Sequence, residues 1–170
     1  TITGSGAGDV LRGYDGNDTI IGNGGMATSN GYTQDNFYGG NGDDALIGSI
    51  DSYNSMWGGA GKDTFQINSG PLPKGKGEAF TINDFKIGED KIAINKSAFK
   101  INGIAISNIV VSNSKDNKFG AGANFHFNTS SGELFFKGNS SNHLAGIFGE
   151  TTSGETYLLA SLSASNFTLV

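Results

Sequence analysis

Large apolar residues recur at near-regular intervals through the first third of the chain. They lie nine, 17, nine, ten and nine residues apart and define one slot: Leu11, Ile20, Phe37, Leu46, Met56 and Phe65. In a three-residue strand centred on this slot, the slot residue points to one side and its neighbours to the other. The pattern therefore predicts very short strands separated by chain reversals.

Glycines and an aspartate at a fixed position precede most of these slots, and Asn54 takes the aspartate position before Met56. The pattern G-G-x-G-x-D-x-U-x, with U the slot residue, is matched at every position by residues 39–47 and 58–66. Degraded copies occupy 4–12, 13–21, 30–38 and 49–57, and residues 22–29 keep the glycines of a seventh copy with Ala27 in the aspartate position. A nine-residue unit cannot bury its own apolar side chain, so the copies are expected to stack on one another.

The composition of the repeat points to a metal. Glycines permit positive φ and leave backbone carbonyls uncovered, and the sixth position adds a carboxylate. Such hard oxygen ligands suit Ca²⁺, whereas Mg²⁺ prefers a tighter octahedron with retained water. The chain has no Cys and only two His, which disfavours zinc and copper sites. Calcium is the predicted cofactor.

Charge supports a link between this metal and folding. Residues 1–66 carry eight Asp against one Arg and one Lys. Stacked aspartates without a cation would place like charges side by side, so binding and folding are expected to be one event. The regular slot argues against a disordered acidic linker. A sequence pI of 4.8 gives no support to nucleic-acid binding, and no apolar run approaches the length of a membrane span.

These repeats resemble those of the RTX (repeats-in-toxin) proteins of bacterial type I secretion. The resemblance implies an all-β fold, a right-handed parallel β-roll in which two nonapeptides form one coil. It also implies Ca²⁺ between alternate repeats, with about three to seven ions in total.

Ligand sets follow from the resemblance. One site would join Gly39, Asn41 and Asp44 to Gly59, Gly61 and Asp63. A second would join Gly13, Asp15 and Asp18 to Gly31, Thr33 and Asp35. A weaker third would use Asp35 with Asn54, while Asp9 and Asp44 would each face the degenerate copy at 22–29.

The rest of the chain alternates with period two and predicts a cap of strands. We expect a roll at 1–67, a loop at 68–79 that holds both prolines, and a C-terminal β-strand and hairpin cap at 80–170. Strand candidates are 80–85, 91–95, 104–111, 124–128, 133–137, 157–162 and 167–170. Residues 124–128 and 133–137 flank Thr-Ser-Ser-Gly, which predicts a hairpin.

This half also carries a resemblance. The segment Ile82-Asn-Asp-Phe-Lys-Ile-Gly-Glu-Asp-Lys-Ile92 is similar to the one that follows the roll in serralysin-type proteases and alginate epimerase R-modules, with Ala93-Ile94 where Asp-Leu is usual. The resemblance makes Asp84 a candidate late calcium ligand. Ser165-Asn-Phe-Thr-Leu-Val170 resembles C-termini that the type I secretion machinery reads, with Asn166 in place of Asp.

Function is predicted accordingly. The chain is expected to be a non-catalytic, secreted, extracellular bacterial module that folds on Ca²⁺ after export and carries the secretion signal of a larger protein. No catalytic constellation is found: both His and the Glu residues are too dispersed to argue an acid/base pair. The alternative is a carbohydrate- or surface-binding module, in which lysines between 74 and 118 or outward strand residues contact a polysaccharide.

Overall fold

The computed structural model describes residues 1–24, 33–48, 52–68, 80–86, 88–95, 109–112, 125–128, 133–137, 142–148 and 166–170. The strands of the repeat region are β1 (Ile2–Thr3), β2 (Val10–Asp15), β3 (Thr19–Ile21), β4 (Thr33–Asn41), β5 (Ala45–Gly48), β6 (Ser52–Ala60) and β7 (Thr64–Ile67). Those that follow are β8 (Phe80–Ile82), β9 (Lys91–Ile94), β10 (Ile109–Ser112), β11 (Phe125–Asn128), β12 (Glu133–Lys137), β13 (Asn142–Phe148) and β14 (Phe167–Leu169). Within these residues, no helix is long and apolar enough to cross a membrane.

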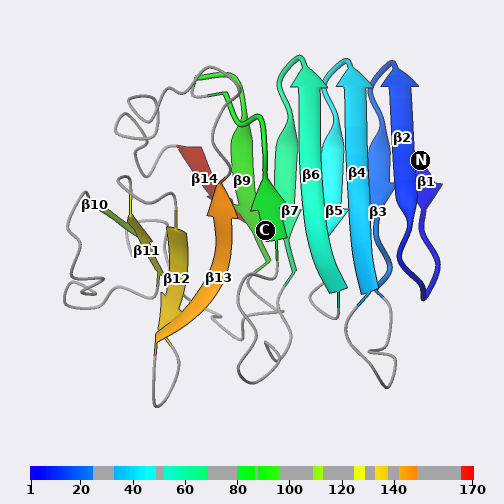
Figure 1. Ribbon diagram of the computed structural model, residues 1–170. Coiled ribbons are helices and arrows are strands. Elements are labelled where there is room, and N and C mark those ends of the chain that lie inside the picture. The colour runs from blue at the N-terminus through cyan, green and yellow to red at the C-terminus, as the bar shows by residue number, and fades with distance from the viewer. Residues whose placement is uncertain are drawn as a thin grey trace.

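The strands form two sheets, which the chain visits alternately from β1 to β9. One sheet has the order β1-β3-β5-β7-β9-β14 and the other β10-β11-β12-β13-β8-β6-β4-β2. Figure 1 shows β2, β4 and β6 side by side in one layer, with β3, β5 and β7 in the layer behind them. From β1 to β9, every pairing within a sheet is parallel. The all-β parallel roll expected from the sequence is confirmed.

Register places the apolar slot in the space between the two sheets. Ile20 pairs with Leu46, and Leu46 with Phe65, in one sheet. Phe37 pairs with Met56 in the other. The slot residues are at most 1% exposed from Ile20 onward, while Leu11 near the open end is partly exposed. Each strand thus contributes one large buried side chain, stabilising by about 1.5–3 kcal/mol, so the core is continuous but thin.

No rung from the degenerate copy at 22–29 lies between the described strands, where one was expected. β2 pairs directly with β4, so that Leu11 meets Phe37, and β3 pairs directly with β5, so that Ile20 meets Leu46. These partners are 26 residues apart instead of 18, because the connection from β3 to β4 includes the eight residues of the degenerate copy. A turn can lengthen at little entropic cost, whereas an extra rung would need a further buried side chain.

The parallel ladders continue beyond residue 67. β8 pairs with β6 on one side and with β13 on the other. β9 pairs with β7 on one side and with β14 on the other.

Strands β11 and β12 form the predicted antiparallel hairpin. Strand β13 was not predicted, because residues around His143 look polar in sequence, and the candidate strand at 157–162 lies outside the described residues. The boundaries 1–67, 68–79 and 80–170 stay a prediction.

Candidate metal centre

Turns that lead from the eight-stranded to the six-stranded sheet stack in register, and we call them the first turn row. The row comprises residues 13–18, 39–44, 58–63 and 84–90. Successive turns are joined through their backbones: Gly16 N–H donates to the Asn41 carbonyl at 2.8 Å, and Gly42 N–H to the Ala60 carbonyl at 2.7 Å. The first three turns of the row therefore form a column of similar six-residue loops.

Glycine is required at the second and fourth turn positions. Gly40 and Gly59 have φ of 118° and 97°, in the left-handed region that L side chains rarely adopt. The Tyr14 carbonyl lies where a Cβ on Gly40 would stand, and the Gly40 carbonyl does the same to Gly59. Carbonyl oxygens of each turn thus point along the row toward the next one. Tyr14 itself adopts φ of 71° in the first turn, where it is largely exposed.

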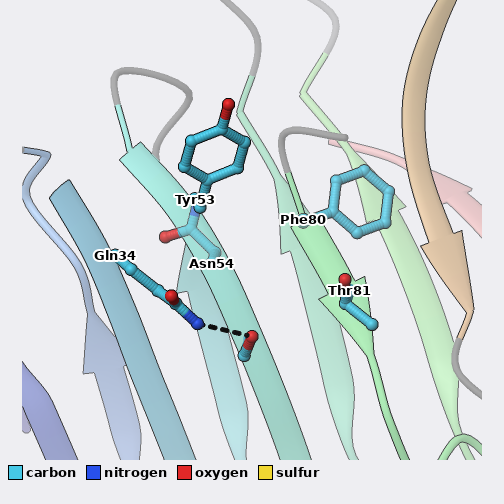
Figure 2. Close-up of a pocket in the computed structure, with 6 residues that line it drawn as sticks. Gln34, Tyr53, Asn54, Phe80 and Thr81 are labelled. Atoms are coloured by element: carbon cyan, nitrogen blue, oxygen red, sulfur yellow. Dashed lines mark hydrogen bonds between the residues drawn. The ribbon is translucent and has the colours of Figure 1, made fainter. Parts of the chain in front are cut away.

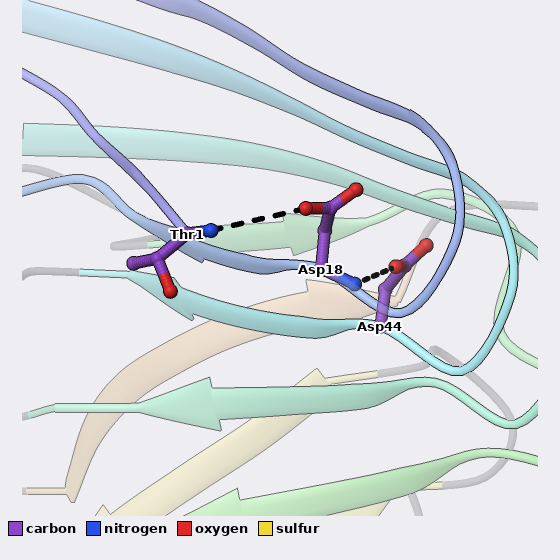
Figure 3. Close-up of polar contacts among 3 residues, drawn as sticks. All are labelled: Thr1, Asp18 and Asp44. Atoms are coloured by element: carbon purple, nitrogen blue, oxygen red, sulfur yellow. Dashed lines mark hydrogen bonds and ion pairs between the residues drawn. The ribbon is translucent and has the colours of Figure 1, made fainter.

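The sixth-position aspartates form a hydrogen-bonded column. The backbone N–H of Asp18 donates to Oδ1 of Asp44 at 2.7 Å, and that of Asp44 to Oδ1 of Asp63 at 3.0 Å. The N–H of Asp63 continues the column to Oδ1 of Asp90 at 2.9 Å. Figure 3 shows the first of these steps, with Asp18 and Asp44 lying on neighbouring turns. One oxygen of each of the last three carboxylates is therefore committed to backbone.

The second carboxylate oxygen, Oδ2, distinguishes Asp44 and Asp63 of the inner turns from Asp90 of the last turn. Within the described structure, Oδ2 of Asp44 and Oδ2 of Asp63 are buried and have no hydrogen-bond partner. The two side chains are 2% and 1% exposed. An unsatisfied buried carboxylate oxygen costs about 1–3 kcal/mol or more. A Cβ on Gly39 or Gly58 would collide with these oxygens, so the cradle around each is kept open by glycine.

Burial also raises the pKa of these carboxyl groups. Desolvation, with additional repulsion from neighbouring carboxylates, raises the pKa of Asp63 to about 6. The same desolvation raises the pKa of Asp44, to which Asp18 and Asp43 add repulsion. Burial raises the pKa of Asp90 as well. The folded turns therefore hold negative charge that the fold alone does not compensate.

This donor set fits Ca²⁺. The residues available are carboxylate oxygens and turn carbonyls, the hard ligands that Ca²⁺ accepts in flexible geometry. In the described part of the chain, no three His, Cys, Asp or Glu side chains form a cluster that could hold a metal by themselves. That result agrees with a site built mainly from backbone carbonyls with one carboxylate per turn.

Of the two main ligand pairs expected from the sequence, the structure brings one together and does not bring together the other. The turns at 39–44 and 58–63 do lie side by side, with Gly40 opposite Gly59 and Asn41 opposite Ala60. The pairing of the turn at 13–18 with residues 31–35 is wrong. Asp15 lies opposite Asn41 and receives a hydrogen bond from its amide at 2.8 Å. The long connection between β3 and β4 shifts the partners by one rung, and this places Asp44 between Asp18 and Asp63.

The opposite turns form a second, weaker row. The N–H of Asp9 donates to Oδ1 of Asp35 at 2.9 Å, so Asp9 faces Asp35 and not the aspartate-free copy. Asp35 lies opposite Asn54, as predicted, and Asn54 lies opposite Phe80. Along the second row, the residue at this position therefore changes from a charged aspartate to a neutral asparagine and then to an apolar phenylalanine. Thr33 has a buried hydroxyl without a partner among the described atoms, while Gly31 lies outside the described residues.

A shallow hollow marks the end of this second row. Its volume is about 210 Å³, and its lining is Gln34, Tyr53, Asn54, Ser55, Phe80 and Thr81 (Figure 2). The Gln34 side-chain amide donates to the Ser55 hydroxyl at 3.4 Å. The lining contains no charged side chain, so the hollow adds no carboxylate to the row.

The final turn contains residues that sequence reasoning missed. Asp90 occupies the sixth position of a further partial repeat, Gly88-Glu-Asp90-Lys-Ile92, in which Gly88 has φ of 89° and Ile92 is buried. The period alone could have revealed it. Both oxygens of Asp84 accept backbone N–H groups, from Gly58 at 2.8 Å and Gly59 at 2.9 Å. The calcium-ligand role of Asp84 stays a prediction.

At the opposite end, the row is open. The N-terminal amino group approaches the Asp18 carboxylate at 3.9 Å (Figure 3). Such an exposed, long ion pair contributes little to stability because water screens it. Asp18 is also less buried than Asp44 or Asp63.

Comparison with known proteins agrees with this architecture. The family described as Peptidase M10 serralysin C terminal matches residues 11–153, well over half of the chain. Among curated proteins, none matches the chain. The chain belongs to the serralysin C-terminal family, whose members are non-catalytic RTX-type calcium-binding repeat modules of secreted bacterial proteins.

Proposed function

We propose that Ca²⁺ binds between the stacked turns of the first turn row and that this binding folds the roll. The observation that carries the proposal is the pair of buried, unpartnered oxygens on Asp44 and Asp63. Carboxylates of Asp18, Asp44 and Asp63, with turn carbonyls, are the ligands we assign. Bound Ca²⁺ would supply the positive charge that the column lacks. Asp9, Asp35 and Asn54 would form a weaker set in the second row.

Electrostatics supports the link between binding and folding. Neighbouring strands in a sheet lie about 4.8 Å apart, and two carboxylates at that separation repel by roughly 3 kcal/mol at an effective dielectric constant of about 20. The column repeats this repulsion along the row. A core of one large side chain per strand leaves little surplus to oppose it, so the metal-free roll should be unstable at neutral pH.

Folding that depends on Ca²⁺ would serve the export of the chain. We infer that the chain stays unfolded in the calcium-poor cytosol, passes the type I secretion machinery and folds outside the cell, where Ca²⁺ is abundant. The expected secretion signal overlaps β14, in which Phe167 is 1% exposed and pairs with Ile92. This supports a signal that is read before folding buries it. The roll at 1–67, loop at 68–79 and cap at 80–170 are the units that we propose.

Far-ultraviolet circular dichroism of the 170-residue chain tests the proposal. We expect a strand signal in millimolar Ca²⁺ that is lost in excess EGTA and returns when Ca²⁺ is restored. Mg²⁺ at the same concentration is the control and should restore little, because it resists dehydration. A strand signal that persists unchanged in EGTA would contradict calcium-dependent folding.

A second candidate function, polysaccharide binding, has one observation in its favour. On the outer face of β2, β4 and β6, Tyr38 and Trp57 stack with ring centroids 4.7 Å apart, and the Arg12 guanidinium lies 4.9 Å from the Tyr38 centroid. Such a stack can pack against a sugar ring. Trp57 is the only tryptophan, so its fluorescence should change on titration with alginate. An unchanged spectrum would dismiss this candidate.

A further inference from the structure

The first turn row ends differently from the way it begins. In the inner turns, the second-position carbonyls of Tyr14 and Gly40 point at the glycine of the next turn. In the last turn the second position, counted back from Asp90, is Lys86 and not glycine, and the Gly59 carbonyl does not approach Gly88. It accepts a hydrogen bond from the ammonium group of Lys86. A side chain of the protein therefore places a positive charge in the last gap of the row.

Carboxylates around this gap are also satisfied by the chain. Asp90 accepts N–H groups from Asp63 at 2.9 Å and from Lys86 at 2.7 Å, so each of its oxygens has a donor. Asp84 accepts two further N–H groups from the turn at 58–63. The inner turns present the opposite situation, because Asp44 and Asp63 each keep one buried oxygen without a partner.

The distribution of charged groups also distinguishes the last gap of the row from the inner gaps. The last turn brings Asp84 and Asp90 close to Asp63, and the positive charge of Lys86 acts on Asp90 in the same turn. No comparable cation serves the inner gaps within the described structure: Lys62 is exposed, and the N-terminus reaches only the outer turn. The row thus has a built-in cation at one end only.

We propose that Lys86 is a tethered cation that closes the calcium row. The gap between residues 58–63 and 84–90 holds the Lys86 ammonium group in place of Ca²⁺, and Ca²⁺ enters only the two inner gaps of this row. This inference rests on the proposed calcium binding. It also gives Asp84 a structural role in place of the ligand role expected from the sequence. Its carboxylate accepts the N–H groups of Gly58 and Gly59 and so anchors the last turn.

A consequence is that the last coil depends less on Ca²⁺ than the others. A covalently attached ammonium group is present at any Ca²⁺ concentration, whereas a bound ion stabilises only in proportion to its occupancy. The closure between β6–β7 and β8–β9 therefore retains its cation in EGTA. Folding on Ca²⁺ addition would then proceed from this end of the row toward the N-terminus.

Counting bound Ca²⁺ in a Lys86→Met variant tests the proposal. Met keeps the length of the aliphatic stem without the charge. By calorimetric titration of the 170-residue chain, the variant should bind one more Ca²⁺ than the unmodified protein, and its melting temperature should be lower at limiting Ca²⁺ but recover in saturating Ca²⁺. Lys91→Met, which removes an exposed lysine from β9, is the matched control and should change neither quantity. Lys86→Arg should keep the original count.

Each outcome decides between the proposals. If the unmodified chain binds Ca²⁺ but Lys86→Met binds the same number or fewer, the Lys86 inference is overturned and calcium binding survives. If Lys86→Met does not fold even in saturating Ca²⁺, the gap cannot exchange ammonium for Ca²⁺ and the inference falls as well. If the unmodified chain binds no Ca²⁺, both proposals fall.

Discussion

At the scale of single residues, the chemistry of this protein is concentrated in one turn position. An aspartate at the sixth position directs one oxygen to the backbone of the neighbouring rung and leaves the other in a glycine-lined cradle. Replacing the aspartate by Asn, as at residue 54, keeps the stacking but removes the charge. The sixth position of a turn can therefore hold a charged aspartate or a neutral asparagine without any change of fold.

Asp63 should make the metal-free protein less stable as the pH rises from about 4 to about 6. Its pKa is raised from 3.8 to about 6, mainly by burial. Over this range the unfolded chain releases a proton that the folded chain retains, so the free energy of unfolding falls, by at most about 3 kcal/mol in total. Below pH 4 both states are protonated and the penalty is absent.

Calcium should reverse this dependence. Ca²⁺ binds the ionised carboxylate, so protons compete with it below about pH 6, and the stabilisation by Ca²⁺ should be larger at pH 7.5 than at pH 5. Urea unfolding at both pH values, in saturating and in limiting Ca²⁺, measures the difference. The Asp63→Asn variant is the control, because it should lose most of this pH dependence. An equal calcium effect at both pH values would argue against Asp63 as a ligand.

At the scale of elements, strands determine the register and turns tolerate change. The strands repeat a buried side chain in register, whereas the connections differ in length: β4 and β5 are joined by three residues, and β3 and β4 by eleven. Gly22, at the start of the longer connection, still faces the turn at 4–9, since its carbonyl lies where a Cβ on Gly4 would stand. The register of the strands is thus kept although the connection is longer.

Shortening the long turn should leave the roll intact. Deletion of residues 25–32, combined with Thr33→Gly, gives the six-residue turn Gly22-Asn-Gly-Gly-Gln-Asp35, with a glycine at the fourth position, where positive φ is needed. We expect the circular dichroism spectrum in Ca²⁺ to be retained and stability to change by no more than about 1 kcal/mol, because loop closure depends weakly on length. Loss of the strand signal would show that the deleted segment supports a rung.

At the scale of the whole molecule, the roll is an open stack whose last coil is covered by strands from far along the chain. β14 pairs with β9, and β13 with β8, so the C-terminal segment completes sheets that begin at residue 2. Phe167 takes the place of a further slot residue opposite Ile92. A terminal unit of this kind shields the final apolar rung, which stacked repeats require.

Truncation of Phe167 should therefore destabilise the entire roll. We expect Phe167→Ala to lower the free energy of unfolding in Ca²⁺ by about 3–5 kcal/mol, because it opens a cavity against the last rung. Thr168→Ala, on the partly exposed face of the same strand, should change it by less than about 0.5 kcal/mol. Urea denaturation at saturating Ca²⁺ makes the comparison. Equal effects of the two substitutions would mean that β14 does not seal the core.

Sequence by itself determined the repeat, the inward apolar slot, the acidic turn position and the hairpin at 124–137, because short-range periodicity and turn chemistry encode them locally. It predicted that residues 39–44 and 58–63 meet. It did not reveal Asp90, although the partial repeat around Gly88 and Ile92 was present. The departures of that copy at its first positions concealed the signal.

Only the tertiary structure decided which turns are neighbours. Pairing between rungs depends on how many residues connect successive strands, and the single long connection from β3 to β4 placed Asp18 beside Asp44 and Asp9 beside Asp35. The Lys86 contact with Gly59 likewise joins residues 27 apart that share no sequence pattern. Such contacts follow from the stacking of rungs in space, which the spacing of apolar residues does not specify when a turn changes length.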